Sequence, residues 1–443
     1  MRSYLILGMC ILFLIQYFVE IQWLQYLLVF VSLIAFFGSV TKASRFPRIA
    51  GLIMMAVGIT VEWSKGTGID GISEGLILIL PLLTLLTLVP LLSIPLRLGG
   101  YFESISVLLH HLLHQPKKLF TGITGTLFLL SPILNLGSVR IIHEFLEDLK
   151  FPSAMTAKGY IMGFTTAIMW SPYFASVSLV LHYLNVSFHE YILYGISLGL
   201  LSLIVGNLLF VFWVKRHPLA LGSPVIGQLD KKIQKQLFKL ILFVLILLGL
   251  CLGVESITHW SMMVIVCLMS IVIPSIFGLK KSNWRQMHPL LIDYRDRTVP
   301  MLNNEIMLFM SAGMLAFAMK GTTAMNGISS ILIGFANQSF FLFALAILVF
   351  VLVVSYIGIH QIAAVGVLAM QLNPSDLGIS NVALALILLL SWSISTALSP
   401  FSGLSLMVSR FSGISGIKEG LRVNGQHVLI FSIVSIVIIS FIK

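Results

Sequence analysis

The chain has 443 residues, of which 58% are hydrophobic and 10% carry a charge, and its formal net charge is +11. Long apolar runs recur from Tyr4 to Ile442, so most of the chain is suited to lipid, and a soluble domain of useful size is excluded. The Lys and Arg residues lie in short loops without an aromatic and basic platform. We therefore interpret the positive charge as topogenic and expect no nucleic-acid partner.

Each apolar run of about 20 residues can cross a hydrocarbon core of about 30 Å as a helix, because a helix satisfies its own backbone hydrogen bonds. A helical bundle is favoured over a barrel, whose strands would alternate in polarity. The sequence thus predicts an all-α polytopic membrane protein with about 11 transmembrane helices. In chain order they lie near 4–20, 23–40, 49–63, 75–96, 155–183, 190–214, 237–254, 260–279, 305–320, 380–409 and 424–442.

Two further segments, 119–150 and 338–372, do not have the pattern of single spans. Each has an apolar arm, a small or polar interruption, and a second arm too short or too polar to cross alone. This pattern is typical of a re-entrant hairpin, which is tolerated where its tip is buried in protein or lines a cavity.

Charge bias orients the predicted spans. With the N-terminus in the cytoplasm, the cytoplasmic loops hold most of the Lys and Arg residues, whereas the opposite side holds little beyond Lys65 and Lys320. One missed helix would invert every later loop, so this asymmetry supports the helix count. We expect a multi-pass protein of the cytoplasmic membrane with its C-terminus outside.

The sequence offers no sign of metal or catalytic chemistry. The three cysteines, Cys10, Cys251 and Cys267, lie within apolar runs without CxxC spacing, so we interpret them as core residues. Ser, His and acidic residues are scattered over both predicted sides, and no HExxH, GxSxG or P-loop pattern occurs. We expect neither an enzyme nor a cofactor, apart from Na⁺ or H⁺ as a coupling ion.

The most informative pattern is an internal repeat. The segment 170–175 puts Ser171-Pro172 before an aromatic residue, Tyr173, and the segment 398–403 does the same with Ser399-Pro400 before Phe401; the offset is 399 − 171 = 228. The order of the surrounding elements repeats too, and the hairpins would enter from opposite sides. The sequence thus predicts two inverted repeats.

The two prolines connect the repeat with ligand binding. Proline lacks an N–H and clashes with the preceding turn, so Pro172 and Pro400 should break their helices near the bilayer middle. Each break exposes half-helix ends with partial charges of roughly ±0.5, which can bind ions and polar substrate groups.

The Ser-Pro pair, the two hairpin segments and the helix from Glu305 to Gly313 resemble the ion transporter superfamily. This group includes divalent anion/sodium symporters, arsenite and sodium/proton permeases, and the large membrane subunits of tripartite carboxylate transporters. Members are commonly elevator transporters, in which hairpins and broken helices move against a scaffold. The Ser-Asn-Thr and Asn-Asn-Asp tips of two of its branches are absent, so the branch stays open.

The resemblance implies a domain organisation and a dimer interface in the scaffold. The implied units are an extra N-terminal helix (1–22), a first scaffold half (23–118), a first transport half (119–214, with hairpin 119–150 and broken helix 155–183), a cytoplasmic linker (215–236), a second scaffold half (237–337) and a second transport half (338–443, with hairpin 338–372 and broken helix 380–409).

Candidate binding residues follow from the tips and the breaks. Arg140 could clamp a carboxylate or phosphate, or it could simply meet Glu144 one turn away. His360 could couple transport to protons, or it could be a structural histidine bonded to a carbonyl. The full set predicted to converge on one substrate and ion site is Asn135, Gly137, Ser138, Arg140, Ser171, Pro172, Tyr173, His360, Gln361, Ser399, Pro400 and Phe401.

Three functions stay open at this point. The first is a secondary transporter of a small organic anion coupled to protons or sodium. The second is a sodium/proton antiporter or an inorganic oxyanion permease on the same scaffold. The third, of another class, is a lipid-phosphate flippase or an envelope-biosynthesis membrane protein. Paired tips at the membrane centre favour a soluble solute, because lipid enzymes usually cluster Asp, His and Arg at one interface.

Overall fold

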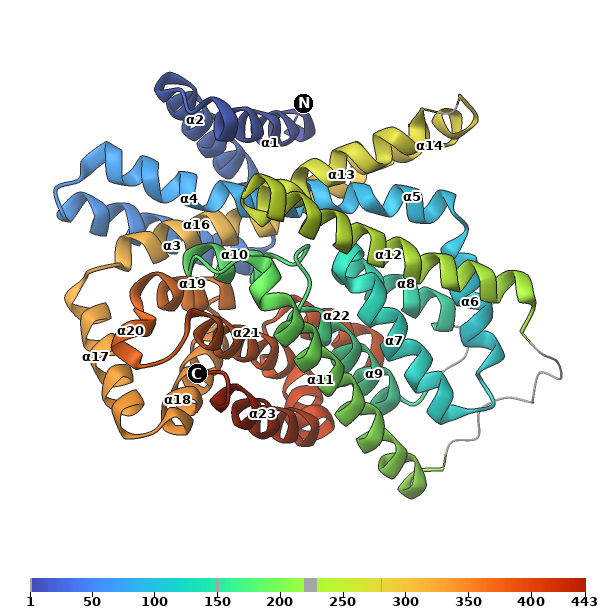
Figure 1. Cartoon of the computed structure of the whole chain (residues 1–443). Helices are drawn as coiled ribbons and strands as arrows, with labels where there is room; N and C mark the ends of the chain where they lie inside the picture. The colour runs from blue at the N-terminus through green and yellow to red at the C-terminus, as the bar shows by residue number, and fades with distance from the viewer. Residues whose placement is uncertain (1, 148–150, 219–228, 280) are drawn as a thin grey trace.

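A computed structural model describes residues 2–147, 151–218, 229–279 and 281–443, and these residues form helices joined by short loops, with no strand among them (Figure 1). The prediction of an all-α protein is confirmed. In the first half of the chain the structure contains α1 (Arg2–Val19), α2 (Gln22–Val40), α3 (Arg45–Ser64), α4 (Gly68–Leu88), η1 (Val89–Leu92), α5 (Ser93–Leu98), α6 (Tyr101–His111), α7 (Pro116–Leu134), α8 (Leu136–Leu146), α9 (Ser153–Ala167), α10 (Ala175–Tyr183) and α11 (Phe188–Arg216).

The second half begins after residues 219–228, which lie in the predicted linker 215–236 and outside the described residues. Its elements include two π-helices, η3 and η4. They are α12 (Lys231–Thr258), α13 (Met262–Gly278), α14 (Lys281–Asp293), η3 (Tyr294–Thr298), α15 (Val299–Met301), α16 (Asn303–Met319), α17 (Thr323–Gln338), α18 (Phe340–Tyr356), α19 (Gln361–Gln371), α20 (Pro374–Leu377), α21 (Asn381–Leu398), α22 (Gly403–Ser412), η4 (Lys418–Asn424) and α23 (Gly425–Ser440).

Within the described residues, eight helical stretches are long and apolar enough to cross a membrane, or up to nine if the bent pair Asn283–Met301 and Asn303–Met319 is one span. This length and composition fit a multi-pass membrane protein. One expected connection differs from the structure: residues 281–301, between the predicted spans 260–279 and 305–320, are largely helical, because α14, η3 and α15 continue almost to the start of α16. Its apolar residues, too few for a span, are enough for a helix that packs on α13.

The closest helix pair joins the two halves of the chain. Ser44 before α3 donates its backbone N–H to Asn304 Oδ1 over 2.9 Å, and a methyl group at Gly51 would lie 3.0 Å from the Met307 carbonyl oxygen. At Gly58 the nearest atom is the Leu315 nitrogen at 3.1 Å. The order of these contacts makes α3 and α16 parallel neighbours (Figure 1). Small residues permit such close approach where no water drives helix association.

The remaining core interlocks the halves. Each hairpin-like pair packs on the broken helix of its own half, α7 on α9 and α18 on α21. Each short second arm also packs on the other half, α8 on α22 and α19 on α10. The segments on either side of each Ser-Pro pair are therefore enclosed by protein, and residues 383–398 of α21 are all buried.

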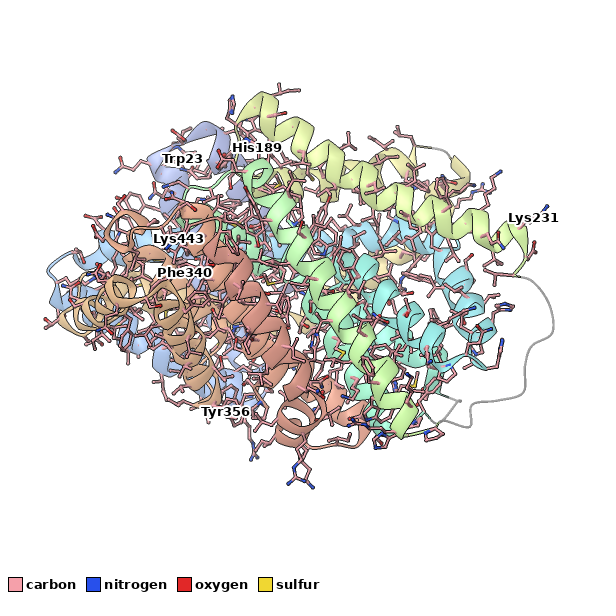
Figure 2. All side chains as sticks on the ribbon, turned by 60° about the horizontal axis from the view of Figure 1, so that its bottom comes forward. Trp23, His189, Lys231, Phe340, Tyr356 and Lys443 are labelled. Atoms are coloured by element: carbon pink, nitrogen blue, oxygen red, sulfur yellow. The ribbon has the colours of Figure 1, made fainter. Side chains whose placement is uncertain are left out.

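Hydrogen bonds near the ends of helices distinguish the two ends of the bundle. At one end, Lys65 Nζ donates to the Lys320 carbonyl over 2.9 Å, and Asn381 Nδ2 donates to the Leu184 carbonyl over 3.0 Å. At the other end, Gln236 donates to the Gly99 carbonyl. Figure 2 shows His189, Phe340 and Lys443 toward one end and Lys231 at the opposite end.

Candidate functional site

Both Ser-Pro segments lie in breaks between helices and form the same turn. Helix α9 ends at Ala167 and α10 begins at Ala175, while α21 ends at Leu398 and α22 begins at Gly403. Ser171 Oγ accepts a hydrogen bond from the Tyr173 N–H over 3.2 Å, and Ser399 Oγ accepts one from the Phe401 N–H over 3.3 Å. A hydroxyl that bonds the backbone two residues on stabilises a turn at the expense of the helix.

The first tip is held by its own polar groups. Asn135 separates α7 from α8 and has a φ of 50°, which is uncommon for a residue other than glycine. Its Oδ1 accepts from the Leu136 N–H over 2.8 Å, and its carbonyl accepts from the Ser138 hydroxyl over 2.7 Å. Ser138 is buried and also lies 2.8 Å from the Ser131 hydroxyl. Gly137 is the next residue in this turn.

The second tip is capped in a similar way. Gly358 has a φ of 97°, a conformation that favours glycine. His360 Nδ1 accepts from the Ile362 N–H over 3.2 Å and so caps α19, and its ring meets the Phe309 ring edge to face at 5.1 Å. Gln361 is buried at the first position of α19. His360 therefore has a structural role as a helix cap, through a backbone N–H and not through the carbonyl bond considered from the sequence.

The second break lies against both tips. A methyl group at Gly403 would lie 3.2 Å from a Leu136 methyl group, so the N-termini of α22 and α8 meet. Ser399 Oγ donates to the Ser355 carbonyl over 3.0 Å, and the Tyr356 hydroxyl donates to the Leu398 carbonyl over 3.0 Å. The segments around Asn135, His360 and Pro400 are therefore neighbours.

The first break has other partners. The Tyr173 hydroxyl lies 3.4 Å from Cys251 Sγ on α12, and Trp170 packs on Phe128 with ring centroids 5.0 Å apart. Among the described residues, no hydrogen bond or ring contact links Ser171, Pro172 or Tyr173 to either tip. The two breaks are nevertheless connected by helix packing. Helices α9 and α10, on either side of the first break, both pack on α21, which ends at the second break.

One contact between α9 and α21 relates the halves directly. Ser393 Oγ donates to the Thr165 carbonyl over 3.1 Å. The separation, 393 − 165 = 228, equals the offset between Ser171 and Ser399. Two positions that correspond in the repeat predicted from the sequence therefore contact each other.

Arg140 lies on α8, one turn after the tip, and is exposed. The ion pairs within the described residues are Lys65–Glu62, Arg295–Asp296 and Arg297–Asp293, and none involves Arg140. It is thus not paired with Glu144, the structural alternative considered from the sequence. Farther along α8, His143 stacks on Phe411 of α22 with centroids 3.9 Å apart.

Two glycines behind the breaks were not predicted as important. A methyl group at Gly195 would lie 2.7 Å from the Met169 carbonyl oxygen, and one at Gly420 would lie 2.7 Å from the Leu398 carbonyl oxygen. Gly195 lets α11, and Gly420 lets η4, approach the backbone where the helix before the break ends. Their offset, 420 − 195 = 225, is close to that of the Ser-Pro pairs and was a signal available in the sequence.

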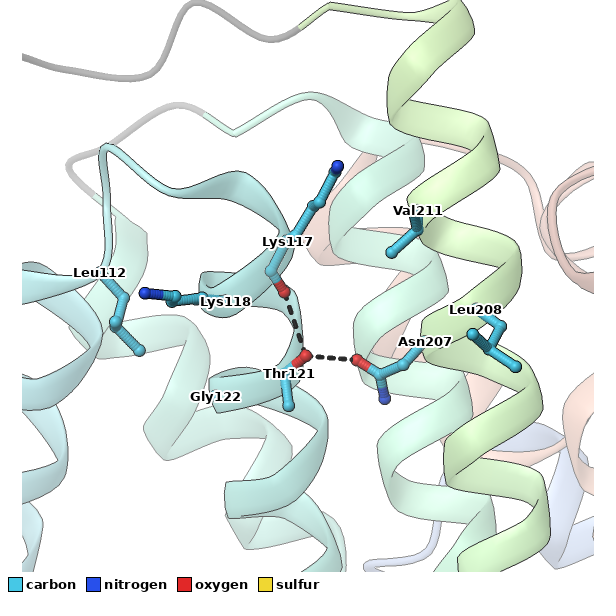
Figure 3. A pocket seen from close by; sticks show the side chains of 8 residues that line it. All are labelled: Leu112, Lys117, Lys118, Thr121, Gly122, Asn207, Leu208 and Val211. Carbon is cyan, nitrogen blue, oxygen red and sulfur yellow. Dashed lines mark hydrogen bonds between the residues drawn. The ribbon is translucent and has the colours of Figure 1, made fainter.

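Two open grooves lie away from the predicted site residues. One, of about 450 Å³, lies between α7 and α11, where Thr121 Oγ1 donates to Asn207 Oδ1 over 2.7 Å and Lys117 and Lys118 line the edge (Figure 3). The other, of about 460 Å³, includes Tyr294 and Arg295. Over the described residues, no group of three or more His, Cys, Asp or Glu side chains could hold a metal ion.

The geometry therefore provides two equivalent helix breaks, two capped tips and one place where three of these four segments meet. The elements come from both halves of the chain, so the arrangement depends on the whole fold. No protein-family model and no curated protein matches this chain.

Proposed function

We propose that this chain is a secondary active transporter that moves a small organic anion, such as a carboxylate, across the cytoplasmic membrane. In this proposal a proton or sodium gradient drives an elevator motion. The observation that carries it is the meeting of the α8 and α22 N-termini, which belong to opposite halves of the chain. Helix N-termini carry partial positive charge, and two of them at one place favour an anion.

The repeat supports a transporter architecture. In two copies related by a twofold axis, a residue can touch its own counterpart only near that axis, and Thr165 and Ser393 meet this condition. The matching turns at Ser171 and Ser399 fit the same relation. Inverted repeats with broken helices at their interface are the usual frame of a midplane binding site.

The packing suggests which parts move. We assign 119–214 and 338–443 to a transport unit, because their hairpins and broken helices interlock across the halves. The tight pair α3 and α16 belongs to the scaffold, against which that unit would slide. Residues 148–150, at the end of the first predicted hairpin, lie outside the described residues. A homodimer through the scaffold stays a prediction.

The loop contacts support the proposed topology of eleven crossings and two re-entrant hairpins. Lys65 with Lys320, and Leu184 with Asn381, each join loops predicted to be outside. Gly99 with Gln236 joins loops predicted to be cytoplasmic. We therefore propose a cytoplasmic N-terminus and an external C-terminus.

Labelling tests this topology. Two exposed residues, His189 and Lys235, are replaced singly by cysteine; the native cysteines are buried and provide low background. In intact cells a membrane-impermeant maleimide should modify H189C and not K235C. Inverted vesicles should reverse the result. Labelling of both variants from the same side would reject the proposed topology.

One observation favours the lipid-phosphate alternative. The groove of Figure 3 combines Lys117 and Lys118 with the apolar side chains of Leu112, Leu208 and Val211, as a phospholipid headgroup and chain would require. The groove lies on the outer side of the α7 and α11 pair and not at the meeting of the tips. A soluble anion at the tips thus remains our first choice, with an antiporter or an inorganic oxyanion permease as alternatives on the same scaffold.

A thermal-shift screen of the purified protein tests the function. Carboxylates, inorganic oxyanions, amino acids and isoprenoid phosphates are added singly, in sodium and in choline buffer. A carboxylate should raise the unfolding temperature, because a ligand that binds only the folded state stabilises it by mass action, by about 2.7 kcal/mol at 100 times its Kd. Stabilisation by isoprenoid phosphates alone would support the lipid alternative and reject ours.

A further inference from the structure

Buried polar side chains line one face of the last helical stretch, where the sequence predicted no site. Glu419 and Asn424 are 0% exposed and His427 is 3% exposed. Glu419 and Asn424 are five residues apart in the π-helix η4, whose i to i+5 spacing places them one turn apart. His427 follows three residues later in α23, which continues the same face.

Each of these side chains has an acceptor without a partner among the described residues. Glu419 Oε2 accepts from the Ser409 hydroxyl over 3.0 Å, but Oε1 accepts from none. Asn424 Nδ2 donates to the Glu419 carbonyl over 3.0 Å, and its Oδ1 has no donor. The result is two buried oxygen acceptors, one π-helical turn apart.

His427 adds a third acceptor. Its Nε2 lies 3.1 Å from the Ser202 carbonyl oxygen, which can only accept, so Nε2 carries the hydrogen. Nδ1 is then the basic nitrogen of the neutral ring, and within the described residues it has no partner. A buried polar face with three acceptors that receive no hydrogen bond has a strong preference for anything that supplies a proton.

The surrounding charges do not neutralise Glu419. Among the described residues no ion pair within 4.0 Å includes it. Lys158 of α9 donates to the Val423 carbonyl over 2.5 Å and lies 6.0 Å from the Trp213 ring. Helix α9 also provides Tyr160, which bonds His143, and α22 provides Arg410, which is exposed. Lys418 and Arg422 of η4 itself are exposed. The neighbouring helix α21 has no titratable side chain.

We propose that the Glu419 carboxyl is a proton-carrying site and that its O–H donates to Asn424 Oδ1. A proton that binds Oε1 removes the buried negative charge and supplies the donor that Asn424 lacks; its release leaves the electron pair on Oε1. This inference rests on the proposed transport function, for which it names the proton as coupling ion. It assigns the proton to Glu419 in place of His360, whose Nδ1 caps α19.

The place of Glu419 in the fold suits this role. It lies five residues before the last proposed span, 424–442, next to exposed Lys418, and Gly420 beside it contacts the Leu398 carbonyl just before the second break. A change in charge at Glu419 therefore occurs beside the segment that meets both tips. Sodium would need several more oxygen ligands than Glu419 and Asn424 offer.

Infrared spectroscopy of the purified full-length protein tests the proposal. When the pH is raised, the wild type should lose the carbonyl-stretch band of a buried carboxylic acid. Glu419→Gln should lack the Glu419 part of this band, which the difference from the wild-type spectrum separates from other buried carboxyls such as Glu305, while the control Glu144→Gln, at an exposed position on α8, should show no such difference. Asn424→Ala should move the band to higher frequency, because the O–H loses its acceptor. A wild type without the band, or a band of unchanged intensity in Glu419→Gln, would overturn the proposal.

Three arms keep the result interpretable. If Glu419→Gln is not monodisperse, Glu419→Asp retains a carboxyl on a shorter side chain and should shift the band; an unchanged band would again overturn the proposal. At fixed pH, loss of the band on replacing choline by sodium would reassign the site to a metal cation. The infrared band needs no substrate, so the two proposals can fail separately. A band in the wild type, with no carboxylate that raises the unfolding temperature, would reject the transport function but not the proton site. Stabilisation by a carboxylate, with no band in the wild type, would reject the proton site but not the transport function.

Discussion

Gly420→Ala is expected to destabilise the protein by about 1–3 kcal/mol, the usual range for overpacking a close contact. The added methyl group would lie 2.7 Å from the Leu398 carbonyl oxygen and 3.0 Å from the Leu398 Cα. Both atoms are backbone, so no side chain can rotate to relieve the contact. Either η4 or the end of α21 must move, and the unfolding temperature of the purified protein should fall.

Gly425→Ala is the matched control. Gly425 begins α23 five residues later, and the nearest atom to an added methyl group, the Gly420 carbonyl oxygen, is 3.8 Å away. Alanine has a higher helix propensity than glycine by about 1 kcal/mol, so this variant should be as stable as the wild type or more so. Equal unfolding temperatures for the two alanine variants would show that the close contact behind the break is not needed for stability.

The helices were largely predictable because each one corresponds to an apolar run in the sequence, and residues that stop a helix follow that run. The predicted spans 4–20, 23–40 and 260–279 agree with α1, α2 and α13 to within two residues at each end. Proline and serine marked the breaks: Pro172 and Pro400 cannot donate to a helix ladder, and the preceding serine closes the turn. These are local effects, so a single segment contains the information.

The contacts between segments were less predictable, because they depend on the positions of helices far apart in the chain. Periodicity placed Asn135 and His360 at tips but did not indicate that both would cap the helix that follows. It also gave Glu419 no special role, since a carboxyl at the start of a span usually lies in water. Its burial results from η4 folding back against Leu398, which only the whole fold produces.

The helical character of 281–301 was missed for a related physical reason. The segment is too polar for a span and holds Pro289, so hydropathy alone favoured a loop. In the structure Arg295 pairs with its neighbour Asp296 at 2.7 Å and donates to the Tyr4 hydroxyl at 2.5 Å, and the second contact connects the segment to α1. Tertiary contacts of this kind commonly override weak local preference.

Arg140→Gln is expected to weaken binding of the transported anion by about 2–5 kcal/mol, the cost of removing one partner of a charge pair that the bound anion and the closed site shield from water. That corresponds to a roughly 30-fold to several thousand-fold rise in Kd. Arg140 follows the meeting point of the α8 and α22 N-termini by one turn and has no ion-pair partner among the described residues, so its guanidinium is free to bind a ligand. Arg140→Lys should restore binding only in part, because an ammonium cannot form the planar fork of two hydrogen bonds.

Arg410→Gln on α22 is the control for charge alone. Arg410 is exposed near the end of a helix that packs on α8, and its removal lowers the net charge by the same amount. The measurement is the concentration dependence of the thermal shift with whichever carboxylate stabilises the wild type, which reports binding without requiring transport. A Kd that is unchanged in Arg140→Gln, or that rises equally in Arg410→Gln, would remove Arg140 from the site. The helix N-termini at Leu136 and Gly403 would then be the main source of positive potential for the anion, since backbone N–H groups persist in every variant.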